Sequence, residues 1–274
     1  MSKTEYWVHN LDPFLFQFTE SFGIRYYGLA YALGFLIGMW LLHIFCKHGK
    51  ATLTPDQQSC IITSMMIGVL LGGRMGYMLF YAFDDILRRP WVIFQIWKGG
   101  MASHGGFIGV LVACWWVAKK LNLSILRLGD LICPLVPAGI LLGRIANFIN
   151  GELWGKVSHV SWAVIFPQSA TPGTPLELIE PRHPSQLYAA GLEGAILLAY
   201  SQWRLWKTDV LASPGRLTGE FLLIYAVVRI FGEQFREPDA SLIMDLSRGS
   251  FYSIFLLIAG AFLIYCSATR RRVD

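Results

Sequence analysis

The chain has 274 residues, of which 54% are hydrophobic and only 15% are charged, and its formal net charge is +5. Soluble domains carry about 25% charged residues, so the composition favours an integral membrane protein over a soluble domain. A positive balance also suits nucleic acid, but basic residues beside apolar segments set membrane orientation, and we expect no nucleic-acid partner. The five cysteines form no CxxC pair and predict neither a disulfide framework nor a metal site.

Seven apolar segments follow one another along the chain. They span residues 29–46, 61–83, 105–118, 131–148, 186–203, 220–235 and 251–266. Most approach the length of about 20 residues that a membrane-spanning helix needs, although the third and sixth are short. We therefore predict an all-α integral membrane protein, with about seven transmembrane helices in a single polytopic membrane domain over residues 1–274. The tryptophan-bearing stretch 84–104 is typical of an interfacial segment.

The orientation follows from lysine and arginine, which are concentrated in the loops after the first, third, fifth and seventh segments. Examples are Lys47, Lys50, Lys119, Lys120, Arg204 and Lys207. The positive-inside rule then places the N-terminus outside and the C-terminus in the cytoplasm. The longest outer loop, residues 150–184, is rich in proline and serine and is predicted to form a small extracytoplasmic cap.

Small residues recur within two of the segments. The second carries Gly68, Gly72 and Gly76, each four residues apart, and the fourth carries Gly139 and Gly143. Glycines at this spacing let two helix backbones approach closely in lipid. The pattern predicts close helix packing and gives no information on chemistry.

Charged side chains inside the apolar segments are more informative, because each costs about 2.5–3.5 kcal/mol at the centre of a membrane helix on insertion scales. They are Arg74 in the second segment, Arg144 in the fourth, and Arg229, Glu233 and Arg236 in the sixth. At helical spacing, Arg144 shares a face with Asn147. The three charged residues of the sixth segment also share one face.

These polar residues are predicted to lie at one depth. In the deduced orientation, segments two, four and six run outward and carry polar residues in their later halves. Segments one, three and five carry them at their starts, as with Tyr26, Tyr27, His104 and the run 182–188. Six segments would then contribute to a single cavity that opens toward the outer leaflet.

Structural explanations compete with functional ones at several of these positions. Arg236, near a helix end, can extend to the lipid headgroups. Glu233 can neutralise a neighbouring arginine, and Arg74 suits a structural hydrogen-bonding role as well as a substrate role. His104 can be a hydrogen-bonded histidine at a helix start, and the two tyrosines can belong to an interfacial belt.

Several arginines at headgroup depth predict an anionic ligand, and the nearest abundant anion is a phospholipid phosphate. No enzyme nucleophile stands out, because Ser103 and His104 lie outside a G-x-S-x-G elbow and the sequence has no H-E-x-x-H. A direct transfer fits better, with the nucleophile supplied by a second substrate and His104 as general base. The alternatives are a transporter or flippase for an anionic lipid or solute, although no inverted repeat is seen, and a binding module without chemistry.

The run 143–155, Gly-Arg-Ile-Ala-Asn-Phe-Ile-Asn-Gly-Glu-Leu-Trp-Gly, resembles the signature of the bacterial phosphatidylglycerol–prolipoprotein diacylglyceryl transferases. Supporting matches occur in family order at residues 25–28, 72–77, 99–106, 182–188 and 229–239. Two departures are Ala146, where glycine is usual, and Ala189, where a glutamate is common. Any role of the glutamate carboxylate that is common at position 189 would be absent here.

The resemblance implies a reaction and a set of residues. The family transfers the diacylglyceryl group of phosphatidylglycerol to the lipobox cysteine in the signal peptide of a prolipoprotein, which forms a thioether, releases glycerol 1-phosphate and needs no cofactor. This first step of lipoprotein maturation implies the bacterial inner membrane, with the site toward the outer leaflet. The expected catalytic residues are Arg144, Arg229, His104 and Tyr27. The expected substrate-binding residues are Arg144, Asn147, Glu152, Arg229, Glu233, Arg236, Arg74 and Tyr26.

Overall fold

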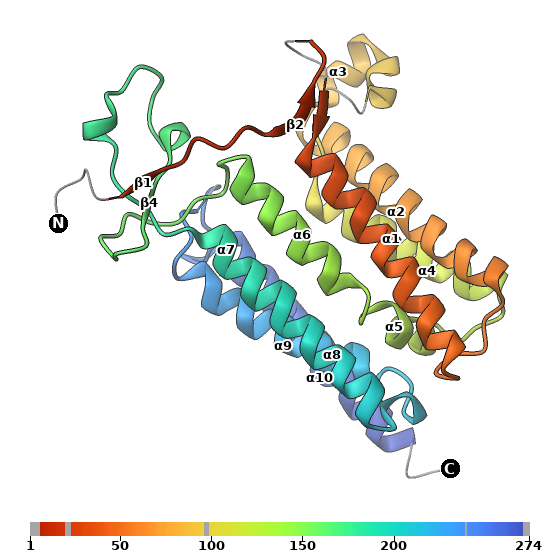
Figure 1. Ribbon diagram of the computed structural model, residues 1–274. Coiled ribbons are helices and arrows are strands. Elements are labelled where there is room, and N and C mark those ends of the chain that lie inside the picture. Colours follow the sequence, from red (N-terminus) through yellow and green to blue (C-terminus); the bar gives the residue numbers. More distant parts are fainter. Residues whose placement is uncertain (1–5, 20–22, 96–98, 239, 271–274) are drawn as a thin grey trace. The chain divides into compact units, whose positions relative to one another are not determined.

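The computed structural model describes residues 6–19, 23–95, 99–238 and 240–270 (Figure 1). Residues 96–98 of the predicted interfacial segment, and Asp239 of the last matching run, lie outside the described residues. The chain divides into two compact units. Unit 1 comprises Met1–Gly38 and Ile132–Asp274, and unit 2 comprises Met39–Leu131.

Unit 2 is built on a pair of helices, α2 (Pro55–Tyr81) and α4 (Ser103–Lys120), which pack along their length. Thr54 begins α2 with a capping box, since it accepts a bond from the main chain of Gln57 while Gln57 Oε1 accepts one from Thr54 N. Shorter elements follow α2, namely α3 (Phe83–Arg88) and the 3-10 helix η2 (Pro90–Phe94), while α5 (Ile125–Ile132) closes the unit.

Glycines set the spacing between α2 and α4. A Cβ on Gly68 would lie 2.6 Å from the main-chain oxygen of Gly109, and one on Gly76 would lie 2.7 Å from Gly105 Cα. The two backbones therefore touch, which confirms the close packing predicted for the second segment. For the fourth segment, a Cβ on Gly34 of the first segment would lie 3.2 Å from Gly139 Cα, but a Cβ on Gly139 itself or on Gly143 would meet no described atom within 4 Å. Among the described residues, the close approach predicted for this segment is therefore seen at Gly139 and not at Gly143.

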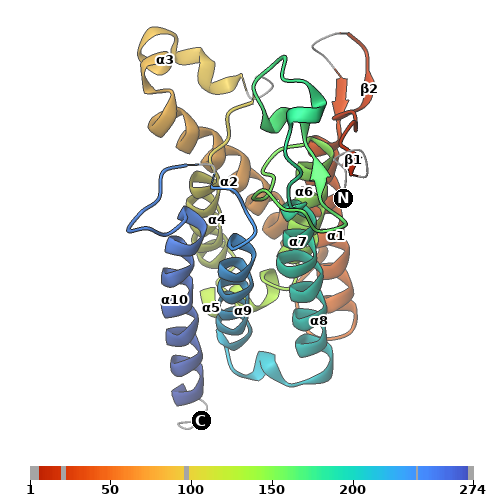
Figure 2. The same cartoon turned by 90° about the vertical axis from the view of Figure 1, so that its left-hand side faces the viewer.

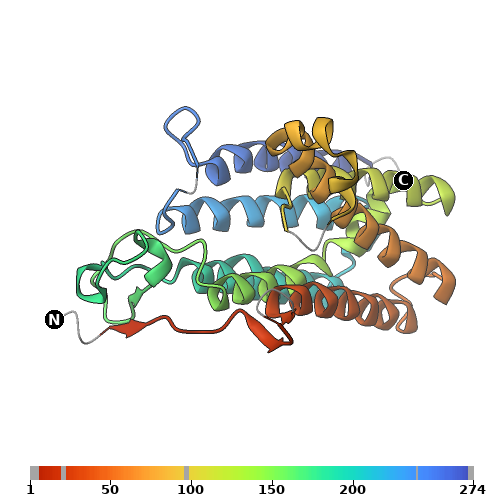
Figure 3. The same cartoon turned by 90° about the horizontal axis from the view of Figure 1, so that it is seen from above.

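Unit 1 contains the start of α1 (Tyr26–Lys47), α6 (Val136–Ile149), α9 (Arg216–Glu233) and α10 (Arg248–Arg270). It also contains a long helical run in which α7 (Ser185–Ala189), a π-helical stretch η6 (Ala190–Ile196) and α8 (Leu197–Lys207) follow without a break. The short 3-10 helix η7 (Val210–Ala212) leads from α8 to α9. Helices α9 and α10 lie side by side (Figures 2 and 3).

The loop predicted as a cap folds together with the N-terminal segment. Strand β1 (Trp7–Val8) pairs in parallel with β4 (Val164–Ile165), and β2 (Phe14–Gln17) pairs antiparallel with β3 (Gly23–Arg25). Two 3-10 helices, η4 (Pro167–Ser169) and η5 (Leu176–Leu178), complete the loop. Its small core contains Tyr6, Ala163, Ile165 and Ile179. The cap is thus a packed layer with its own apolar interior.

All seven predicted apolar segments are helical, but they differ from the expected uninterrupted spans. Among the described residues, three helices are long and apolar enough to cross a membrane, namely Tyr26–Lys47, Pro55–Tyr81 and Arg248–Thr269. A fourth candidate is the pair Ile125–Ile132 and Val136–Ile149, which is bent by 45°. Prolines 134 and 137 explain this bend, since proline interrupts helical hydrogen bonding. The part of the chain that the structure describes is therefore mostly helical and contains three to four candidate spans.

Candidate active site

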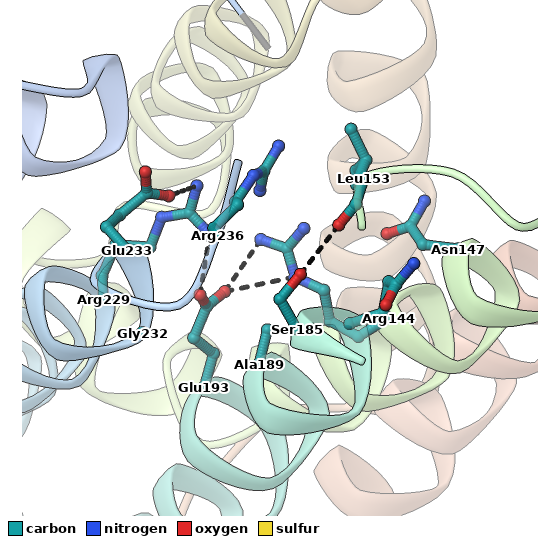
Figure 4. Close-up of a pocket in the computed structure, with 11 residues that line it drawn as sticks. Arg144, Asn147, Leu153, Ser185, Ala189, Glu193, Arg229, Gly232, Glu233 and Arg236 are labelled. Atoms are coloured by element: carbon teal, nitrogen blue, oxygen red, sulfur yellow. Dashed lines mark hydrogen bonds and ion pairs between the residues drawn. The ribbon is translucent and has the colours of Figure 1, made fainter. Parts of the chain in front are cut away.

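A cleft in unit 1 brings together five of the residues predicted from the sequence. They are Arg144, Asn147, Arg229, Glu233 and Arg236 (Figure 4). They come from the end of α6, from the end of α9 and from the chain just beyond it. Arg236 was predicted on the same helix face as Arg229 and Glu233, but α9 ends at Glu233. Arg236 reaches the cleft from a main-chain bridge to Gly155 instead.

At the centre of the cleft, Glu193 joins the two principal arginines. Arg144 Nη2 lies 2.8 Å from Glu193 Oε2, and Arg229 Nη1 lies 2.8 Å from Glu193 Oε1. The carboxylate is 1% exposed, and Figure 4 shows it pointing between the two guanidinium groups. Each oxygen serves a different arginine, so Glu193 fixes the distance between the two positive charges.

The local structure of the helical run explains how Glu193 reaches Arg144. Glu193 lies in the π-helical stretch η6, and π-helical turns are frequent at functional sites. The next residue, Gly194, packs on α6, where a Cβ would lie 2.7 Å from Leu141 Cα. The absence of a side chain at Gly194 therefore lets η6 approach α6 one turn before Arg144.

The second carboxylate of the cleft belongs to α9. Glu233 Oε1 lies 2.6 Å from Arg229 Nη2, but the contact is not aligned as a hydrogen bond, so this oxygen keeps its acceptor capacity. Helix α10 packs on the pair, because a Cβ on Gly249 would lie 2.6 Å from Glu233 Oε1 and 2.9 Å from Arg229 Nε. Arg229 is thus held by one carboxylate on each side.

A polar network leads from Asn147 into the cap. Asn147 Nδ2 donates to Glu152 Oε1 at 2.8 Å, and Gln186 Nε2 donates to the main-chain oxygen of Glu152 at 2.6 Å. The turn between them needs Gly151, which has φ of +65° and lies against Gln168 and His9. His9 Nε2 in turn donates to the main-chain oxygen of Phe148 at 2.7 Å. The cap therefore fixes the end of α6.

The cap also joins the start of α7 to the end of α9. Gly155 N donates to the main-chain oxygen of His183 at 2.9 Å, and Lys156 N donates to that of Phe235 at 2.9 Å. A Cβ on Gly155 would lie 2.6 Å from His183 Cβ and 2.5 Å from Phe235 O, so only glycine fits. Partial burial lowers the pKa of the His183 imidazole, which favours its neutral form.

Tyr26 and Tyr27 occupy the first turn of α1. Tyr26 N donates to the main-chain oxygen of Pro13 at 3.1 Å, and the ring of Tyr27 lies 5.4 Å from that of Tyr31. Within the described part of the chain, neither tyrosine lines the cleft. The catalytic role expected for Tyr27 and the binding role expected for Tyr26 stay predictions.

The other two predicted residues, Arg74 and His104, belong to unit 2. Arg74 is 4% exposed, and its guanidinium donates to the main-chain oxygens of Val92, Ile93, Gly99 and Gly100 at 2.5–3.2 Å. Most of its donors are therefore committed to the loop before α4. His104 lies in the first turn of α4, with its ring 5.5 Å from that of Phe80 and 5.8 Å from that of Tyr81. The predicted single cavity spans both units and stays a prediction.

Sequence reasoning missed Glu193, although the signal was present. It is a charged residue within an apolar segment, and the same cost of burial that selected Arg144 and Arg229 applies to it. The sequence drew attention to Ala189 as a lost carboxylate, and Ala189 does line the cleft. A carboxylate reaches the same cleft from four residues further along the helical run.

Among the described residues, no group of three His, Cys, Asp or Glu side chains is placed to hold a metal ion.

The apolar helices and the arginine–carboxylate cleft define a helical membrane protein with a site suited to an anion. A family model described as prolipoprotein diacylglyceryl transferase matches residues 13–266, and the chain belongs to this family.

Curated relatives agree with the family model over nearly the whole chain. A protein of Legionella pneumophila (strain Corby) is 42% identical over 93% of this chain and 96% of its own length. One of Zymomonas mobilis is 43% identical over 90% and 85%, and one of Aeromonas hydrophila is 39% identical over 98% and 96%. All three are named phosphatidylglycerol–prolipoprotein diacylglyceryl transferase.

Proposed function

We propose that this protein transfers the diacylglyceryl group of phosphatidylglycerol to the lipobox cysteine thiol of prolipoproteins, forming a thioether and releasing glycerol 1-phosphate. The observation that carries the proposal is the pairing of Arg144 and Arg229 on the single carboxylate of Glu193. Two guanidinium groups held this way present donors to one phosphate. The names of the relatives support the choice of substrates.

The charge of the cleft suits a phosphodiester. Its lining contains three arginines and two glutamates, which leave one net positive charge against the single negative charge of phosphatidylglycerol. Each guanidinium has five N–H donors, and the two carboxylates use only some of them. The remaining donors are available to the phosphate, and the carboxylates already fix the orientation of the arginines.

Transfer increases the negative charge at this position. The thiolate sulfur attacks C3 of the diacylglycerol, the C3–O bond breaks, and its electron pair stays on the phosphate oxygen. The phosphodiester monoanion thereby becomes a phosphomonoester with a second negative charge. Arginines that attract the product charge more strongly than the substrate charge lower the barrier, which is the condition for catalysis. We assign this stabilisation to Arg144, Arg229 and Arg236.

The thiol proton needs an acceptor. A free thiol has a pKa of about 8.5, so only a few per cent is thiolate at neutral pH. We assign the general base to His104 and a supporting catalytic role to Tyr27, with Tyr26, Asn147, Glu152 and Glu233 in substrate binding. Arg74, whose donors hold the loop before α4, is assigned to that loop rather than to the phosphate.

The membrane arrangement completes the proposal. Seven helical segments would cross the bacterial inner membrane, with the N-terminus outside, the C-terminus in the cytoplasm and the cleft toward the outer leaflet. The cap would then face the compartment in which exported prolipoproteins present their cysteine.

The test uses the purified protein, phosphatidylglycerol and a lipobox peptide. Glycerol phosphate release should depend on the peptide thiol and disappear when serine replaces the peptide cysteine. Arg144→Ala should abolish release, whereas Arg216→Ala, which removes an arginine from an ion pair with Glu220 away from the cleft, should retain it. Retained release by Arg144→Ala would contradict the phosphate-binding role. Near-normal turnover by His104→Gln would remove that residue from proton transfer.

A further inference from the structure

Gln186 carries a buried hydrogen-bond acceptor that the mechanism above does not use. The residue lies in the first turn of α7, is 2% exposed and lines the arginine cleft. Among the described residues, no donor lies within hydrogen-bonding reach of its side-chain oxygen Oε1. A buried acceptor without a partner costs about 1–3 kcal/mol, so its presence in a binding cleft calls for a functional explanation.

The orientation of the amide is fixed by its other end. Gln186 Nε2 donates to the main-chain oxygen of Glu152 at 2.6 Å, and a flipped amide would place two oxygens against each other. The neighbouring Ser185 reinforces the position, because its Oγ donates to the main-chain oxygen of Leu153 at 2.9 Å. Gln186 is therefore held with its oxygen as the acceptor, and this oxygen cannot exchange places with the amide nitrogen.

The surroundings define the donor that this oxygen can take. An ammonium group is disfavoured, because the lining carries a net positive charge from its three arginines and two glutamates. A thiol is only a weak donor. A hydroxyl is a neutral and strong donor, and the glycerol headgroup of phosphatidylglycerol has two of them next to its phosphate.

We infer that Gln186 determines headgroup specificity: its side-chain oxygen accepts a hydrogen bond from a glycerol hydroxyl while the arginines hold the adjacent phosphate. This inference rests on the proposed function and adds a residue to it. Phosphate binding alone would admit any anionic phospholipid. An acceptor that must be satisfied makes the site reject headgroups that lack a hydroxyl, because they leave the buried oxygen unpaired.

The test combines two lipids with two forms of the protein. The lipids are phosphatidylglycerol and an analogue whose headgroup is a propyl phosphodiester, which keeps the phosphate and removes both hydroxyls. The variant is Gln186→Met, which is similar in size and removes the amide. The wild type should use phosphatidylglycerol roughly 5–100 times faster than the analogue, the range expected for one buried hydrogen bond. Gln186→Met should lose this preference, so that the ratio of its rates with the two lipids falls toward one.

A matched control is Gln202→Met. Gln202 also donates from Nε2 to a main-chain oxygen, that of Pro134 at 2.9 Å, but its Oε1 accepts from Trp206 Nε1 and it does not line the cleft. This variant should keep the full preference for phosphatidylglycerol. It also reports how much a lost glutamine–carbonyl bond affects folding in this helical run.

Other outcomes overturn the inference. If Gln186→Met slows both lipids by the same factor, the glutamine acts only through its bond to Glu152, or on the thiol, and not on the headgroup. A wild type that does not distinguish the two lipids also overturns it, and this measurement needs no variant to fold. Failure of the proposed function differs from both, because the wild type would then release no glycerol phosphate in a thiol-dependent way.

Discussion

Two arginine environments in this molecule contrast with each other. Arg74 in unit 2 is surrounded by main-chain oxygens of Val92, Ile93, Gly99 and Gly100. Arg144 and Arg229 in unit 1 are instead paired with carboxylates. The main-chain carbonyls accept hydrogen bonds from most N–H groups of the Arg74 guanidinium, and these bonds hold the loop against the arginine. Carboxylates hold the guanidinium groups while leaving donors on their outer edges.

The difference shows why a buried arginine alone does not identify a substrate site. An arginine whose donors go to the main chain cannot bind a ligand without releasing that loop. An arginine fixed by a shared carboxylate is already oriented for a second anion. We propose that the partners of the guanidinium group, rather than its burial, separate a structural arginine from one that binds substrate.

The largest effect is expected from removing the shared carboxylate. Glu193→Ala leaves two partly buried guanidinium groups without their shared carboxylate, and loss of one partner from a buried ion pair costs up to about 3–5 kcal/mol of folding free energy. Transfer per folded molecule should also fall about 10²-fold, because small misplacements of binding groups have effects of this size. Thermal unfolding in detergent and the glycerol phosphate assay measure the two losses.

Glu220→Ala is the matched control for this prediction. Glu220 also accepts from two arginines, Arg204 and Arg216, each at 2.7 Å, but it lies outside the cleft. The control should lose stability and retain transfer per folded molecule. Equal loss of transfer in both variants would show that Glu193 has no special role in the cleft.

A smaller effect is expected at Arg74. Arg74→Lys keeps the charge, but an ammonium with three donors cannot reach four carbonyls in this geometry. The loss should be about 1–3 kcal/mol of stability for each carbonyl left unpaired, with faster hydrogen exchange in η2. Arg88→Lys, at an exposed arginine of α3, should change neither. Normal stability with weakened phosphatidylglycerol binding would instead restore the substrate role predicted from the sequence.

The smallest effect is expected at Gly249, where α10 contacts the Arg229–Glu233 pair. Gly249→Ala adds a methyl group 2.6 Å from Glu233 Oε1, closer than an ordinary van der Waals contact, so the ion pair must shift. Transfer should fall about fivefold, equivalent to roughly 1 kcal/mol, the lower end of what overpacking costs. Gly191→Ala, where a Cβ would meet no described atom within 4 Å, should leave transfer unchanged. No difference between these variants would show that the pair tolerates movement.

The helical segments were predictable, because apolar runs near 20 residues are typical of membrane helices. The polar site was predictable because charged residues inside such runs are costly and indicate a function. Five predicted residues do meet in one cleft. The sequence did not predict which main-chain groups the arginine side chains contact. The carbonyls around Arg74 carry no residue-type signal, and the end of α9 before Arg236 depends on the cap. Glu193 is recognisable in the sequence as a charge within an apolar segment. Its position on the site face depends on a π-helical turn, which the sequence does not reveal.

That turn has a consequence for the register of the helical run. An α-helix advances by about 100° per residue, so one residue more or less turns every later side chain by that angle. Gln186 precedes η6 and Glu193 lies within it. The wider turn therefore sets the angular offset between the amide that we assign to the headgroup and the carboxylate that holds the arginines. In the proposed mechanism, lipid selectivity and phosphate binding therefore depend on the same number of residues along one helix.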